Sequence, residues 1–88
     1  GHWAAAQFAV RGLVQALAQE MRPAGVHVAL LVVDGTIQTD RAPMAGRPPE
    51  ESVSPADVAS AVAYLAGQSP RGWTHELVIT PANETWVP

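Results

Sequence analysis

Apolar residues recur every three or four positions along the first quarter of the chain. They are Ala6, Ala9, Val10, Leu13, Leu17 and Met21. This spacing places side chains on one side of a helix, so it predicts a helix over residues 4–21. A polar line at the same spacing consists of Gln7, Arg11, Gln15 and Arg22. Pro23 and Gly25 end the helix, because proline lacks a backbone donor and glycine accepts the left-handed conformation that follows a helix.

The pattern changes after this turn. Residues 26–33 are almost wholly apolar and rich in branched side chains, which predicts a strand buried on both faces, as in a parallel sheet. Residues 34–53 carry glycines, prolines and charges without a period, so they form a long loop. Loops of this length are usually functional or mobile.

A second helix begins after the loop. Ser54 is the cap, Pro55 occupies the first helical position, and Asp57 lies in the first turn, where its charge favours the helix dipole. Gly67 ends this helix. Its predicted buried stripe is Val58, Ala61, Val62 and Leu65.

The chain closes with a second predicted strand, residues 74–80, followed by Pro81. The order is therefore helix, strand, loop, helix, strand. Two strands separated by a helix predict a parallel pair joined by a crossover. Two strands cannot bury both faces of a sheet, so we expect more sheet in the same polypeptide or in a partner.

Composition narrows the function classes. The chain has 88 residues, of which 48% are hydrophobic, and it forms at most one small domain. A net charge of -3, with five arginines and no lysine, provides no basic stripe for nucleic acid and no basic membrane anchor. No apolar run reaches the roughly 18 residues of a membrane span. We therefore expect a soluble, cytoplasmic protein. The three histidines lack metal-ligand spacing, so we expect no metal site.

Three segments together resemble the C-terminal part of the short-chain dehydrogenase/reductase family. "AAAQFAVRGLVQALAQEM" resembles its active-site helix, "GVHVALLVVDGTIQTD" the next strand and loop, and "WTHELVITP" the last strand of the sheet. The resemblance implies an α/β fold, a doubly wound parallel-sheet (Rossmann-like) domain that binds NAD or NADP across the carboxyl ends of its strands. Residues 1–88 are then the C-terminal portion of one such domain, and the N-terminal cofactor-binding half is absent from these residues.

The family carries a tyrosine and, four residues later, a lysine on this helix. Trp3 and Gln7 occupy these positions here. A lysine beside a phenol lowers the phenol's pKa, so that the phenol exchanges a proton with substrate. Indole does not titrate in the useful range and glutamine is neutral, so the catalytic pair is vacated. Trp3 is either a substrate-pocket wall or a packing aromatic, and Gln7 either a hydrogen-bonding partner of the cofactor ribose or a solvated residue.

The loop after the first strand supplies the remaining candidates. The family's proline-glycine appears as Asp34-Gly35. The resemblance implies that the main chain near Ile37 faces the nicotinamide amide and that Thr39 faces phosphate, although Thr39 also fits an ordinary loop hydroxyl. Cofactor-binding candidates are therefore Gln7, Gly35, Ile37 and Thr39. Asp34 repels phosphates if it points inward and caps the turn if it points outward.

These residues leave three functional hypotheses. The first is an NAD- or NADP-dependent oxidoreductase segment of this family with an atypical active site. The second is a catalytically silent cofactor-binding or oligomer-assembly protein of the same fold, and the third is an independent interaction module. The family resemblance implies a homo-oligomer and contact with the rest of the domain. Candidate interface residues are Leu13, Val14, Leu17, Leu77 and Ile79.

Overall fold

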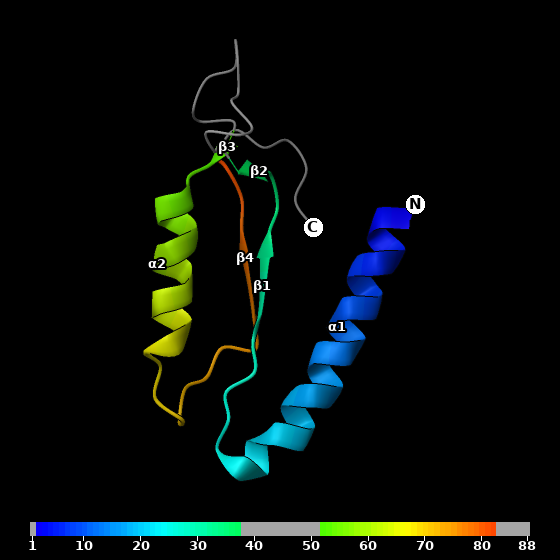
Figure 1. Cartoon of the computed structure of the whole chain (residues 1–88), viewed down its shortest axis with the longest axis vertical. Helices are drawn as coiled ribbons and strands as arrows, with labels where there is room; N and C mark the ends of the chain where they lie inside the picture. The colour runs from blue at the N-terminus through cyan, green and yellow to red at the C-terminus, as the bar shows by residue number, and fades with distance from the viewer. Residues whose placement is uncertain (1, 38–51, 83–88) are drawn as a thin grey trace.

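The predicted order of elements is confirmed (Figure 1). The computed structural model describes residues 2–37 and 52–82. Its helices are α1 (His2–Met21), the 3-10 turn η1 (Arg22–Ala24) and α2 (Pro55–Ala66). Its strands are β1 (Leu30–Val33), β2 (Thr36–Ile37), β3 (Ser52–Val53) and β4 (Glu76–Ile79). The described part is thus a small α/β structure, and none of its helices is long and apolar enough to cross a bilayer.

The predicted helix ends are confirmed with one difference in geometry. Gly25 follows η1 with a positive φ of 77° and donates its N–H to the Arg22 carbonyl at 2.9 Å. Ser54 caps α2, since its hydroxyl accepts the Asp57 N–H at 3.1 Å. Gly67 ends α2 with a φ of -88°, so this helix stops without a left-handed residue.

The two main strands pair in parallel, as predicted. Leu31 lies opposite Leu77 and Val33 opposite Ile79, while Val32 lies opposite Val78. Because successive side chains of a strand point to opposite faces, Leu31, Val33 and their partners share one face and Val32 shares the other with Val78. Paired positions on two parallel strands therefore define two faces that different helices can cover.

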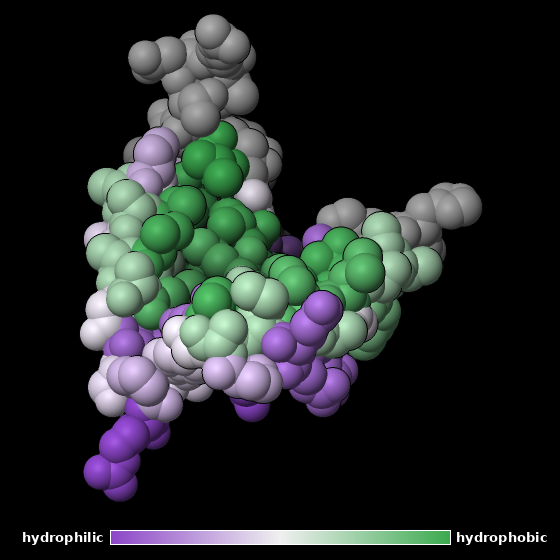
Figure 2. All heavy atoms as spheres, turned by 60° about the horizontal axis from the view of Figure 1, so that its bottom comes forward, coloured by the Kyte–Doolittle hydropathy of each residue, from purple (hydrophilic) through white to green (hydrophobic). Residues whose placement is uncertain are grey.

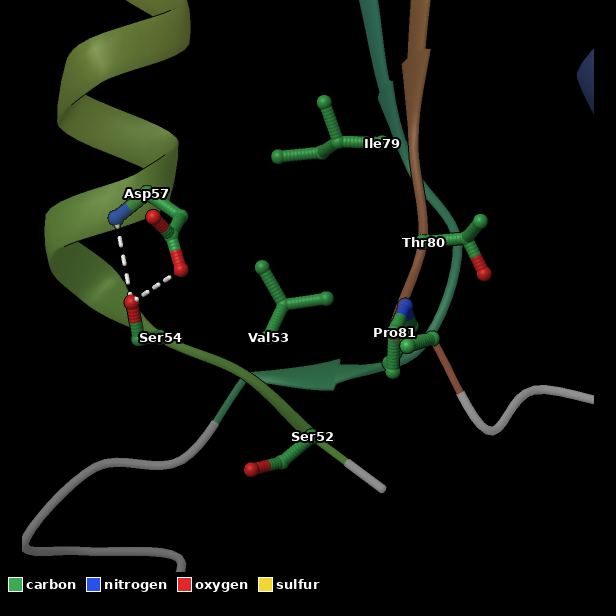
Figure 3. Close-up of a pocket in the computed structure, with 8 residues that line it drawn as sticks. Ser52, Val53, Ser54, Asp57, Ile79, Thr80 and Pro81 are labelled. Carbon is green, nitrogen blue, oxygen red and sulfur yellow. Dashed lines mark hydrogen bonds between the residues drawn. The ribbon is translucent and has the colours of Figure 1, made fainter. Parts of the chain in front are cut away.

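A helix lies on each face of this pair. Ile79 points into the space between β4 and α2, so α2 covers the face that carries Leu77 and Ile79 (Figure 3). Glu76, on the opposite face, accepts from the Arg11 guanidinium of α1 at 2.7 Å. Figure 1 shows the same layering, with both strands between the helices.

The buried core is small. Among the described residues its apolar members are Ala18, Val32, Val53, Ala61 and Leu65. Ala61 and Leu65 confirm part of the predicted α2 stripe, but Val62 is 52% exposed, and its predicted burial is wrong. The reason is geometric: one residue past Ala61 turns roughly 100° around the helix, and a two-stranded sheet is too narrow to cover that much of it.

The apolar line of α1 faces away from the strands. Leu13 is 73% exposed and Leu17 48% exposed, whereas Ala18 is only 2% exposed. The positions turned toward the protein are Gln7, Arg11, Val14, Ala18 and Met21. The Arg11–Glu76 ion pair joins this side of α1 to β4, and the narrow sheet leaves the apolar side of α1 uncovered. Figure 2 shows apolar atoms exposed across the centre of the molecule and over one flank.

The first strand is shorter than predicted. Residues 26–29 lie outside β1, and Val26 is exposed. In this segment, which leads into β1, His27 stacks on Trp73, with ring centroids 4.7 Å apart. Its Nε2 donates to the Thr74 carbonyl at 2.8 Å. Side-chain contacts to the loop before β4 therefore replace the strand hydrogen bonds that the pattern predicted here.

Candidate functional site

The candidate site lies where β1 and β4 end, at the carboxyl edge of the parallel pair. Asp34 follows β1 directly, and its N–H donates to the Ile79 carbonyl at 2.8 Å. Asp34 is only 9% exposed, and its Oδ2 has no hydrogen-bond partner in the part of the chain that the structure describes. A buried carboxylate oxygen without a donor is costly, and such groups often mark a functional position. Asp34 therefore does not serve as an exposed turn cap.

Gly35 occupies a position that only glycine fits well. Its φ is 143°, a conformation that residues with a side chain rarely adopt. A Cβ atom there would lie 2.8 Å from Pro81 Cδ and 3.4 Å from Val53 Cγ2. The close approach that this glycine permits is therefore to Pro81 of the same chain, on the side where its Cβ would lie.

The predicted long loop begins and ends in a short parallel pairing. Thr36 lies opposite Ser52 and Ile37 opposite Val53. The sequence pattern gave no sign of β2 and β3, because two-residue strands are too short to show alternation. This pairing places half-buried Ile37 beside the residues that precede α2, at the same end of the protein as Gly35.

A recess of about 430 Å³ opens between this edge and the start of α2 (Figure 3). Val53 and Ile79 point into it, and Pro81 closes one side. At its edge the Ser54 hydroxyl donates to Asp57 Oδ2 at 2.7 Å. The Ser54 hydroxyl is engaged in the cap of α2 and with the Asp57 carboxylate, and no histidine is among the lining residues. The recess suits an apolar or aromatic group.

The structure brings together only some of the predicted site residues. Gly35 and Ile37 lie at the carboxyl edge, and Gln7 lies half-buried in the first part of α1. No hydrogen bond joins Gln7 to that edge within the described residues. Thr39 and the Trp3 side chain fall outside the described residues. Figure 1 places the start of α1 and the carboxyl ends of the strands at the same end of the protein.

Sequence reasoning missed Pro81 and Val53 as parts of this site. The sequence pattern indicates Pro81 only as the residue that ends a strand, and Val53 only as part of a loop. The contact between Gly35 and Pro81 follows from the three-dimensional structure, because the parallel register brings the residues after β1 next to those after β4. Within residues 2–37 and 52–82, no group of three or more potential metal ligands lies together.

Comparisons with models of known protein families, with curated protein sequences and with solved structures find no match.

Proposed function

We propose that this chain is the C-terminal part of a short-chain dehydrogenase/reductase-like domain that binds NAD or NADP at the carboxyl edge of its strands. One observation carries the proposal: a parallel strand pair has a helix on each face and a glycine in a restricted conformation immediately after its first strand. Ligands of doubly wound α/β folds bind at this edge. The resemblance of three ordered segments supports the same interpretation.

The residues at this edge fit a nicotinamide nucleotide in part. The Asp34 Oδ2 is an acceptor without a partner among the described residues, but it is buried, so the N–H donors of a nicotinamide carboxamide would reach it only if this edge moved. Because Pro81 fills the Cβ side of Gly35, a ligand would approach this backbone from the other side. Ile37 would contribute main-chain groups, and Thr39 its hydroxyl. The negative charge of Asp34 opposes nearby phosphates and favours weak binding.

The bound nucleotide would supply hydride chemistry, while the chain's own residues would bind and orient it. Gln7 would hydrogen-bond ribose hydroxyls, because its amide both donates and accepts. Trp3 has only an indole N–H donor and cannot pass a proton to the substrate oxygen. Losing a positioned acid or base lowers the rate about 10²- to 10⁴-fold, so turnover by this protein would be slow.

Calorimetric titration of NADH and NADPH into the native gene product that carries these residues tests the proposal. We expect saturable heat, and a Gln7→Ala variant should bind about three- to tenfold more weakly, the effect of one hydrogen bond. Gln19→Ala, an exposed glutamine three turns along α1, is the matched control and should bind like the parent. The absence of heat at millimolar nucleotide, or equal effects of both substitutions, would contradict the proposal.

A second candidate function is oligomer assembly without catalysis. It is favoured by the uncovered apolar side of α1, where Val10, Leu13 and Leu17 are all exposed. Monomeric proteins rarely expose large contiguous apolar patches, so such a surface favours association. The proposed partner is a second copy of the chain.

Analytical ultracentrifugation distinguishes assembly from nucleotide binding. Leu13→Asp with Leu17→Asp should convert oligomer to smaller species, because a charge replaces a buried apolar contact in the complex. Gln15→Asp, which adds charge at an exposed polar position of the same helix, should leave the oligomer intact. An oligomer that survives the double substitution would exclude this surface as the interface.

A further inference from the structure

Two arginines line one groove at the amino ends of β1 and β4, at the opposite end of the strands from Gly35. The groove measures about 460 Å³ and forms where η1 meets the loop before β4. Its lining residues are Arg22, Gly25, Pro70, Arg71, Gly72 and Trp73. No carboxylate is among them.

Both arginines that line this groove are exposed. The ion pair found within the described residues joins Arg11 to Glu76, so Arg22 and Arg71 have no acidic partner in that part of the chain. The nearby backbone donors are already used, since Gly72 donates to the Ser69 carbonyl at 2.8 Å and Gly25 to the Arg22 carbonyl at 2.9 Å. The unused donors of the groove are therefore mainly its two arginine side chains.

The loop that carries Arg71 and Trp73 is anchored by side-chain hydrogen bonds. Gln68 accepts the Thr74 N–H at 2.8 Å and donates to the Thr74 hydroxyl at 2.7 Å. The Arg71 N–H donates to the Ser69 hydroxyl at 3.1 Å. The Trp73 ring stacks on His27, with 4° between the ring planes. The groove therefore has a preorganised wall, which lowers the entropic cost of ordering this loop when a ligand binds.

We infer that this groove binds the phosphate group of a small anionic molecule. Guanidinium groups offer paired N–H donors that match phosphate oxygens, and two of them match a dianion better than a singly charged carboxylate. The protein as a whole carries a net charge of -3, which repels anions. A groove lined by two arginines and no acidic residue is a region of positive charge on this protein. This site is distinct from the proposed nucleotide site at the carboxyl edge.

An NMR titration with inorganic phosphate at constant ionic strength, with chloride as the reference anion, tests the inference. The indole N–H signal of Trp73 should shift and saturate. Arg22→Gln and Arg71→Gln should each weaken phosphate binding about five- to tenfold. Arg11→Gln removes the same charge outside the groove and should change the affinity by less than about twofold.

Three results would overturn the inference. The first is a Trp73 signal that does not saturate with phosphate. The second is unchanged affinity in the Arg22→Gln, Arg71→Gln double variant, with an unaltered circular dichroism spectrum showing that the fold is intact. The third is equal or tighter binding of tetraglutamate, which would assign the groove to acidic peptides.

Discussion

Replacing Gly35 with alanine tests the packing at the carboxyl edge. The new Cβ would lie 2.8 Å from Pro81 Cδ and 3.0 Å from Pro81 Cγ, in a residue whose φ is 143°. The unfavourable backbone conformation costs about 1–3 kcal/mol, and overpacking costs about as much again. We therefore expect the free energy of unfolding to fall by roughly 2–6 kcal/mol, which lowers the melting temperature by about 8 °C or more.

Thermal unfolding followed by circular dichroism measures this loss. Gly12→Ala is the matched control, because Gly12 lies inside α1 with open space at its Cβ position beyond the backbone of its own helix, and it should stabilise by about 0.5–1 kcal/mol. Adding Pro81→Ala to Gly35→Ala should restore the overlap part of the loss but leave the backbone strain. If Gly35→Ala unfolds within about 0.5 kcal/mol of the parent, the packing at this edge is not as described.

Three further substitutions test the vacated catalytic pair, the cap of α2 and the ion pair of α1. Trp3→Tyr with Gln7→Lys should raise carbonyl reduction by about 10² to 10⁴ in an NADPH or NADH absorbance assay, and unchanged rates would show that the pocket has diverged elsewhere. Ser54→Ala should destabilise by about 1 kcal/mol in urea unfolding through loss of the α2 cap, whereas exposed Ser60→Ala in the same helix should not destabilise. Arg11→Gln should cost no more than about 1 kcal/mol, because its ion pair is partly exposed, and a larger loss would mean that this pair fixes α1.

Local signals in the sequence predicted the elements well. The Ser54 cap, the left-handed Gly25 and the parallel pairing of the two apolar segments were all predicted and are all confirmed. Each depends on a few neighbouring residues or on the alternation of helix and strand. Such preferences are local and do not depend on the remaining sheet.

Side-chain surroundings were harder to predict, because they depend on contacts between distant segments. The apolar pattern of α2 predicts a buried Val62, yet Val62 is exposed, since two strands cannot cover that much of the helix. The pairing of Gly35 with Pro81 follows from strand register, which the sequence pattern does not specify. The burial of Asp34 was one of two open alternatives, and only the structure distinguishes them.

The central claim is that a nicotinamide nucleotide binds at the carboxyl edge of the strands. Amide chemical shifts of the native gene product during titration with NADH test it most directly, because they locate the ligand residue by residue. We expect saturable shifts at Gly35 and Ile37 and in the side-chain amide of Gln7. Shifts confined to Arg22 and Arg71 at the opposite end, or no saturable shifts, would contradict it.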